Sequence, residues 1–326
     1  MQLHEALSID LADLNQTLLN IIESDQDLPK PSDIHSGIIR LIEAGGKRLR
    51  PIMAITGGRF GPANNPDKVM RIAAMLEYIH MASLIHDDII DDSDLRRNVP
   101  ALHKSVGVNH AIFIANYLMA RVVEWATTGE DVDSAFSALC ASLASLATQL
   151  CVGEYQQLEN RFNFNLTLDE YLEKTRSKTA LLMAKCLEAG AQCNEADEKI
   201  KRILYEFGDA LGISFQIRDD VLDYTQTSEA IGKPAGNDLR NGNVTLPVLY
   251  ALEDPALAAD ILMLNAESSD EEFAAIVVSI KSCGAIERTL ALSESYLAKA
   301  RSYIAELKEY PAYKDLEILL AFFSQG

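Results

Sequence analysis

The residues most suited to chemistry lie in the acidic segment HDDIIDDSDLRR at 86–97. Asp87 and Asp88 precede Asp91 and Asp92 by four residues, so each pair would share a face if the helix continues. Carboxylates this close must share protons or bind a cation, and hard divalent cations prefer oxygen ligands. The two arginines that follow suit phosphate oxygens. The segment fits a metal–diphosphate site, and taken alone it fits a solvated acidic helix end equally well.

A second acidic segment, FQIRDDVLDY at 215–224, repeats the spacing of the first. Its aspartates are Asp219, Asp220 and Asp223. Both segments follow apolar stretches with helical spacing. One acidic cluster arises easily by chance, but the same spacing at the end of two apolar helices does not. The sequence therefore predicts two helices that face each other across a bundle and whose carboxylates hold Mg²⁺ against a diphosphate.

The rest of the chain predicts the helices that would position these clusters. No proline occurs between Pro100 and Pro234, and this stretch is rich in helix-forming residues. No segment shows convincing strand alternation. We expect an all-α fold in which residues 1–326 form a single domain, a bundle of long helices around a central cavity. The expected helices cover 1–24, 33–44, the stretches from Pro51 and from Pro66, 108–128, 131–160, 168–191, 195–224 and the chain from 246 onward, with loops at 96–107 and 227–245.

Composition narrows the class of protein. The formal net charge of −19 argues against nucleic-acid binding and against docking on anionic lipid. The five cysteines form no CxxC pair, which favours reduced thiols in a cytosolic protein. The N-terminus is not a signal peptide, and the apolar runs are too short or too interrupted by charge to span a bilayer. We therefore expect a cytoplasmic protein without a transmembrane segment.

Further motifs surround the two acidic clusters. They are GGKRLRP at 45–51, GEYQQL at 153–158, KTALL at 178–182 and GKPAGNDLRNGNVTLP at 232–247. With the aspartates, their order resembles the trans-isoprenyl diphosphate synthases over about 45–252. In motif detail the chain is most similar to heptaprenyl diphosphate synthase catalytic subunits. The resemblance implies an isoprenoid synthase-like fold and a prenyltransferase that condenses isopentenyl diphosphate with an allylic diphosphate, such as farnesyl diphosphate.

The resemblance also implies roles for single residues. The residues that hold the diphosphate of isopentenyl diphosphate would be Gly46, Lys47, Arg50, His80 and Arg97. Those that act on the allylic diphosphate and the developing cation would be Arg96, Lys178, Lys233, Thr179 and Gln216. The metal ligands would be Asp87, Asp88, Asp91, Asp219, Asp220 and Asp223. They would bind Mg²⁺, about three ions with substrate present, and Mn²⁺ could substitute.

Some of these residues also have simpler interpretations, and the chain departs from the family pattern at a few positions. Taken alone, His80 fits a core histidine, and Lys47 and Arg50 fit charges at a helix end. Asn98 stands where a glycine usually follows the arginine pair. Ala115–Asn116 replaces a Gly–Asp pair, and Asn243–Val244 replaces the usual lysine. These departures bear on the rate more than on the reaction class.

The residues before Asp87 bear on product length. Short-chain members tend to have an aromatic residue where this chain has Ala82 and Ser83. Ile79 lies one turn further toward the N-terminus. An open tunnel at these positions predicts a product of about C30 to C40.

Several alternatives remain open from the sequence. The chain could be a short-chain farnesyl or geranylgeranyl synthase, or a catalytic subunit that is inactive without a small partner. A terpene cyclase would usually carry an Asn/Ser/Glu metal motif and would not need GGKRLRP. An acidic helical scaffold is the non-enzyme alternative. The expected assembly is a homodimer or a heteromer with a small regulatory subunit.

Overall fold

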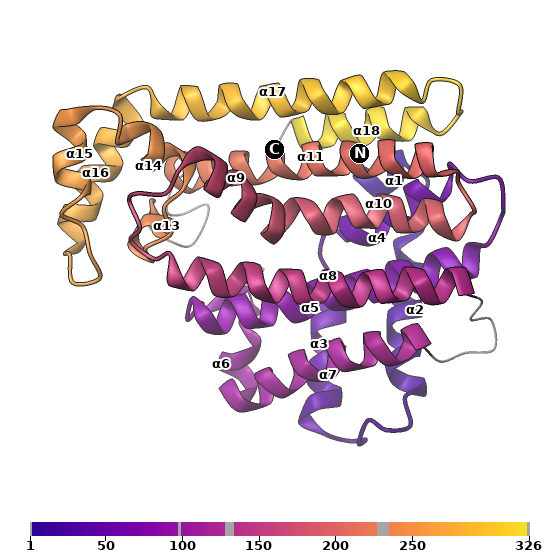
Figure 1. Cartoon of the computed structure of the whole chain (residues 1–326). Coiled ribbons are helices and arrows are strands. Elements are labelled where there is room, and N and C mark those ends of the chain that lie inside the picture. Colours follow the sequence, from indigo (N-terminus) through magenta and orange to yellow (C-terminus); the bar gives the residue numbers. More distant parts are fainter. Residues whose placement is uncertain (1, 97–98, 128–133, 227–234, 325–326) are drawn as a thin grey trace. The chain divides into compact units, whose positions relative to one another are not determined.

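The computed structural model describes residues 2–96, 99–127, 134–226 and 235–324, and in these ranges the chain is all-α apart from one short hairpin (Figure 1). The helices of the first half are α1 (Leu3–Ala6), α2 (Leu11–Ser24), α3 (Asp33–Glu43), α4 (Leu49–Gly58), α5 (Pro66–Ile90), α6 (Leu102–Val106), α7 (Val108–Thr127) and α8 (Ser134–Glu159). Those of the second half are α9 (Leu168–Thr175), the π-helical turn η1 (Arg176–Ala180), α10 (Leu181–Cys193), α11 (Glu198–Thr225), α13 (Asn237–Arg240), α14 (Leu246–Ala251), α15 (Pro255–Ile261), α16 (Asp270–Ser282), α17 (Ala285–Glu306) and α18 (Tyr313–Ser324). Strands β1 (Leu95–Arg96) and β2 (Val99–Pro100) pair antiparallel.

The chain forms two compact units, each built from separate stretches of sequence. Unit 1 comprises Met1–Cys151, Leu182–Tyr205 and Leu307–Leu319, and unit 2 comprises Val152–Leu181, Glu206–Glu306 and Leu320–Gly326. The aspartates of the first cluster belong to unit 1 and those of the second to unit 2. The expectation of a single domain over residues 1–326 stays a prediction.

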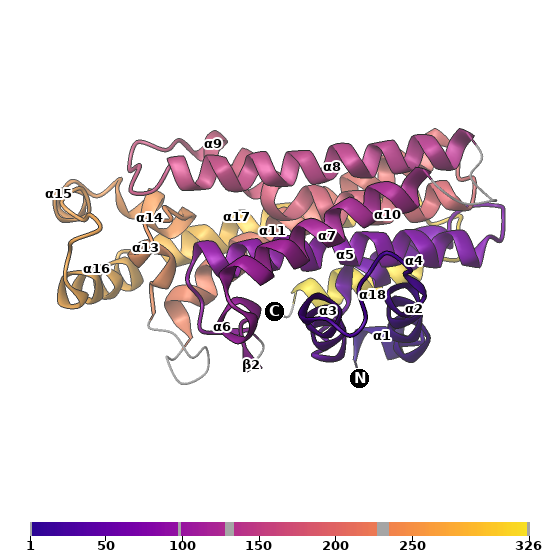
Figure 2. The ribbon, with the colours of Figure 1, turned by 90° about the horizontal axis from the view of Figure 1, so that it is seen from below.

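Unit 1 is organised around α5, which begins at Pro66 in a position where the fixed φ of proline suits the first helical turn. α4 and α7 pack along α5, and α2 and α3 cross these helices steeply (Figures 1 and 2). Two glycines allow α4 and α10 to approach closely. A Cβ at Gly190 would lie 1.8 Å from the carbonyl oxygen of Ala54, and one at Gly57 would lie 2.1 Å from that of Leu187. Only glycine fits this crossing, so the backbones of α4 and α10 pack directly against each other.

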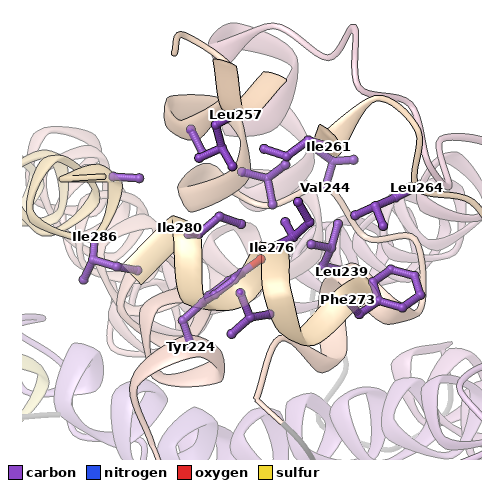
Figure 3. Packing of buried hydrophobic residues seen from close by; sticks show 14 of the residues in the cluster. Tyr224, Leu239, Val244, Leu257, Ile261, Leu264, Phe273, Ile276, Ile280 and Ile286 are labelled. Atoms are coloured by element: carbon purple, nitrogen blue, oxygen red, sulfur yellow. The ribbon is translucent and has the colours of Figure 1, made fainter. Parts of the chain in front are cut away.

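Unit 2 contains the carboxyl-terminal part of α11, together with α9 and α13–α17. Its core cluster joins α15 and α16 to the end of α11. Leu257 and Ile261 lie on one side of α16, and Tyr224 lies against its other side (Figure 3). Tyr224 is fully buried and directly follows Asp223. Because burial of apolar side chains is the main favourable term in folding, this cluster fixes the end of α11 that carries the second group of aspartates.

The structure confirms most of the predicted helices and corrects some. The expected helix 1–24 is interrupted between α1 and α2, because Ser8 has a left-handed backbone (φ 52°) and the Asp10 side chain caps α2 through the amides of Ala12 and Asp13. The expected loops contain the short helices α6 and α13, and the first also contains the hairpin.

One helical stretch in the described part of the chain, Phe136–Glu159 of α8, is long and apolar enough to cross a membrane by length and composition, a test that core helices also pass.

Candidate active site

The first aspartate cluster lies at the carboxyl end of α5, in unit 1. The helix ends at Ile90, and Asp91 keeps a helical backbone as its C-cap, with its N–H donating to the carbonyl oxygen of Asp87 at 2.9 Å. Asp87 and Asp91 therefore lie one turn apart, as predicted. Asp92 does not share a face with Asp88, because its φ of 48° ends the helix. Its exposed carboxylate instead accepts a hydrogen bond from Lys104 at 2.7 Å, which lowers the pKa of Asp92.

Arg96 lies directly against the first cluster because the β1–β2 hairpin folds it back. Its Nε lies 3.0 Å from both carboxylate oxygens of Asp88, and Nη2 also donates to Asp88. Burial by itself would lower the pKa of Arg96. The hydrogen bonds to Asp88 and the negative charges of the cluster have the larger combined effect, so the pKa is raised. A permanently charged guanidinium is thus fixed beside the carboxylates, ready for an anion. Arg97 and Asn98 lie outside the described residues.

The GGKRLRP motif forms the turn into α4. Gly45 and Gly46 have φ values of 68° and 139°, a region that favours glycine because a Cβ would be strained there. Lys47 is exposed after them. Burial lowers the pKa of Arg50, and its Nε has no hydrogen-bond partner among the described residues. A buried cationic donor without an acceptor is a good receptor for an oxyanion. His80 lies half-buried on α5.

The second cluster belongs to unit 2 and contains a chain of hydrogen bonds. The hydroxyl of Thr179 donates to Oε1 of Gln216 at 2.6 Å, and Nε2 of Gln216 donates to Oδ1 of Asp220 at 3.0 Å. The hydroxyl of Tyr171 donates to Oδ2 of the same aspartate at 2.6 Å. Burial raises the pKa of Asp220 to about 6, and the bonds from Gln216 and Tyr171 oppose that rise. Asp219 is exposed.

Asp223 and Asp238 complete the acidic group of unit 2. The two carboxylate oxygens of Asp223 accept hydrogen bonds from the backbone amides of Asn237 and Asp238 at 3.2 and 3.1 Å, and thereby cap α13. Burial, followed by the charges of Asp223 and Asp220, raises the pKa of Asp238 well above its usual value. The sequence analysis did not name Asp238, although it lies inside the GKPAGNDLRNGNVTLP motif.

The π-helical turn η1 separates α9 from α10 and carries Lys178 and Thr179. Turns of this kind inside α-helices are frequent at functional sites. Nζ of Lys178 lies 3.3 Å from Oε1 of Gln157 and from the carboxylate of Glu154, both in unit 2. Lys178 therefore has its side chain held by the GEYQQL motif, whereas Lys233 lies outside the described residues.

Lys174, on α9, is a further cation that sequence analysis missed. Its Nζ donates to the carbonyl oxygen of Val244 at 3.2 Å. Burial lowers the pKa of Lys174, and the charges of Asp220 and Asp238 oppose this effect. Lys174 thus brings a positive charge to the segment where Asn243–Val244 replaces the usual lysine.

The donor groups fit Mg²⁺ that is held mainly by substrate oxygens. Within the described ranges, no group of three or more His, Cys, Asp or Glu side chains is close enough to hold a metal ion by itself. Asp88 is engaged by Arg96, and Asp223 by backbone amides. Mg²⁺ typically binds one or two carboxylates together with water and phosphate oxygens. Each cluster, taken by itself, still has carboxylates that can serve as these ligands.

The product-length residues lie on α5 before the first cluster. Ile79 and Ala82 are fully buried, and the half-buried Ser83 donates its hydroxyl to the carbonyl oxygen of His80 at 2.9 Å. The nearest aromatic residue on the amino-terminal side is Tyr78. It is fully buried and its hydroxyl donates to the carbonyl oxygen of Leu18 at 2.7 Å.

Similarity to known proteins shows the family of this chain. The polyprenyl synthetase family profile matches residues 32–280. The chain belongs to the polyprenyl synthetase family. It is 40% identical to heptaprenyl diphosphate synthase component 2 of Bacillus subtilis over 294 residues, which cover 90% of this chain and 81% of the relative.

Two solved polyprenyl synthase structures share the fold over nearly the whole chain. Heptaprenyl diphosphate synthase from Staphylococcus aureus superposes with a TM-score of 0.87 at 33% identity, over 97% of this chain and 96% of that one. Polyprenyl synthase from Caulobacter crescentus, solved with calcium and isoprenyl diphosphate, gives 0.85 at 32% identity, over 98% and 96%. The predicted all-α isoprenoid synthase fold is therefore confirmed. Polyprenyl synthetases use Mg²⁺ through aspartate-rich motifs, and this chain has two such motifs.

Proposed function

We propose that this polyprenyl synthetase condenses isopentenyl diphosphate with an allylic diphosphate and makes an all-trans polyprenyl diphosphate of about C30 to C40. The observation that carries the proposal is the hydrogen-bonded series Thr179–Gln216–Asp220. It joins the oxygen dipoles suited to an allylic cation to a carboxylate suited to metal-bound diphosphate, within one unit.

The residues have separate tasks in this reaction. When bound, Mg²⁺ supplies charge neutralisation on the diphosphate leaving group. Arg96 and Lys178, with Lys233, contact the allylic diphosphate and stabilise the charge that develops on it. The oxygens of Thr179 and Gln216 face the allylic cation once the carbon–oxygen bond breaks.

The second substrate is held by a different set of groups. Lys47, Arg50, His80 and Arg97 bind the diphosphate of isopentenyl diphosphate and bring its double bond to the allylic carbon. A new carbon–carbon bond forms, and the proton lost from the isopentenyl unit passes to the released diphosphate. The described residues include no group that the geometry marks as a dedicated base.

The assembly and location follow from the same proposal. The Bacillus subtilis relative and that of Geobacillus stearothermophilus are both named as component 2 of heptaprenyl diphosphate synthase. We infer that this chain works in the cytoplasm, either as a homodimer or as a heteromer with a small second subunit. Farnesyl diphosphate is the expected primer.

A prenyl-transfer assay with product sizing tests the proposal. The purified chain is incubated with farnesyl diphosphate, labelled isopentenyl diphosphate and Mg²⁺, and the dephosphorylated products are separated by chromatography. Chelation of Mg²⁺ and Asp87→Ala should each abolish turnover. A chain that binds neither diphosphate in the presence of Mg²⁺ would contradict the proposal. A chain that binds both but turns over only with an added second subunit would support the heteromeric form.

A further inference from the structure

The first arginine of GGKRLRP, Arg48, lies between two residues assigned to isopentenyl diphosphate, Lys47 and Arg50. Its side chain is 1% exposed, whereas Lys47 is exposed. The backbone of Arg48 is left-handed, with φ 49° and ψ 39°, which is unfavourable for a residue with a Cβ. The surrounding fold must therefore stabilise this conformation, and the contacts of the guanidinium show how.

The guanidinium of Arg48 connects three helices of unit 1. Nη1 donates to Oε1 of Glu77 on α5 at 2.7 Å. Nη2 donates to the carbonyl oxygen of Ile42 on α3 at 2.6 Å, and Nε donates to Oδ1 of Asn15 on α2 at 3.0 Å. The Glu77 side chain is only 2% exposed. Because removing one member of a buried ion pair leaves an uncompensated charge, the position of Arg48 is strongly determined.

Glu77 lies on the face of α5 that carries substrate residues. His80 and Asp87 follow it by three and ten residues, spacings that return to one face of a helix. Glu77 also acts on Arg50, because its charge opposes the lowering of the Arg50 pKa by burial. One buried carboxylate therefore connects the GGKRLRP turn to the helix that carries the first aspartates.

We propose that Arg48 and Glu77 are a positioning pair that sets Lys47 and Arg50 against α5 to bind isopentenyl diphosphate. This inference rests on the proposed function. Arg48 does not touch the substrate: its buried bonds fix the left-handed turn, and the turn fixes the direction of its two neighbours. Loss of the pair should therefore raise the KM for isopentenyl diphosphate while that for the allylic substrate stays unchanged. A pair that only stabilises the fold would not separate the two substrates.

A double variant, Arg48→Met with Glu77→Leu, tests this difference. Apolar replacement of both members of a buried ion pair is often neutral for stability. We expect a melting temperature close to that of the wild type, a KM for isopentenyl diphosphate about tenfold higher, and an unchanged KM for farnesyl diphosphate. Arg59→Met with Asp315→Leu is the matched control, since this partly exposed pair, 2.8 Å apart, also lies in unit 1. It should change neither KM. Wild-type stability with both KM values unchanged in the first double variant would overturn the proposal.

Two milder variants keep the test decisive if the double variant does not fold. Glu77→Gln removes the charge, and Asn15→Ala removes a single acceptor. Each should raise the KM for isopentenyl diphosphate about threefold and leave that for farnesyl diphosphate unchanged. A wild-type KM for isopentenyl diphosphate in both variants would refute the pair's role. If the wild-type chain does not turn over alone, calorimetric binding of isopentenyl diphosphate replaces KM. A wild type that binds neither substrate would contradict the proposed function itself.

Discussion

The hydroxyl of Tyr171 donates a 2.6 Å hydrogen bond to Oδ2 of Asp220, and both side chains are almost completely buried. The aromatic ring on α9 thereby fixes one oxygen of a metal-motif carboxylate on α11, while Gln216 fixes the other. Because two donors share this carboxylate, each should affect both its orientation and its pKa.

Tyr171→Phe should weaken metal-dependent activity in a pH-dependent way. The Tyr171 bond lowers the pKa of Asp220, so its loss raises that pKa, and protons then compete with Mg²⁺ over a wider range. At pH 7 we expect the Mg²⁺ concentration for half-maximal rate to rise about fivefold, with recovery above pH 8. Rates measured across Mg²⁺ and pH titrations check this. Tyr250→Phe, in the same unit, is the control and should behave as the wild type. An equal loss at every pH would count against this account.

Asp220→Asn should abolish turnover yet stabilise the metal-free protein at alkaline pH. The usual pKa of Asp220, 3.8, rises to about 6 in the folded chain, so the folded state binds more protons between these values. Stability in the wild type therefore falls as pH rises from about 4 to about 6, by at most about 3 kcal/mol. In the variant this loss should be absent.

Denaturant unfolding in the presence of a chelator measures the difference between Asp220→Asn and the wild type. The two should have similar free energies of unfolding near pH 4, and the variant should be more stable at pH 8. A variant that is less stable than the wild type at pH 8 would show that burial does not destabilise the charged form of Asp220.

Ser83→Phe should shorten the product. Ser83 is half-buried on α5, four residues before Asp87. A phenyl ring can therefore fit at this position, where it would block the growing chain. Ala82→Phe should shorten it too, but Ala82 is fully buried, and overpacking should cost about 1–3 kcal/mol of stability. Chromatography of dephosphorylated products measures the chain length.

Leu84→Phe is the matched control for product length. Leu84 is also half-buried on α5, but it lines a pocket of about 410 Å³ with Asp88 and Arg96, at the diphosphate end of the proposed site. Leu84→Phe should therefore lower the rate and leave the product at the wild-type length. An unchanged length in both the Ser83 and Ala82 variants would show that the tunnel does not pass these positions.

Gly190→Ala should destabilise the protein strongly. The new Cβ would lie 1.8 Å from the carbonyl oxygen of Ala54, so the backbones of α4 and α10 would have to separate. We expect a loss of at least about 3 kcal/mol in the free energy of unfolding, measured by denaturant titration. Gln192→Ala, half-buried on the same helix, should stay within about 0.5 kcal/mol. Comparable values for the two variants would show that α4 and α10 are not held as closely as described.

The sequence by itself determined the fold class and the residues that could do the chemistry. Helical periodicity is local, so α5 and α11 could be located from residue types alone, and the repeated Asp–Asp–x–x–Asp spacing was sufficient to predict a metal–diphosphate site. The same local patterns could not tell where α5 ends. That depends on the left-handed backbone at Asp92, which turns its side chain away from the carboxylate of Asp88.

Tertiary structure decided which partner each charged group has. Arg96 lies on Asp88 because a hairpin folds back, and Lys174 reaches Val244 from a helix far away in the sequence. Neither contact has a periodic signature. The energies of charged groups depend on burial and on neighbours brought together by folding. For this reason the roles of Arg48, Tyr171 and Asp238 became visible only in three dimensions.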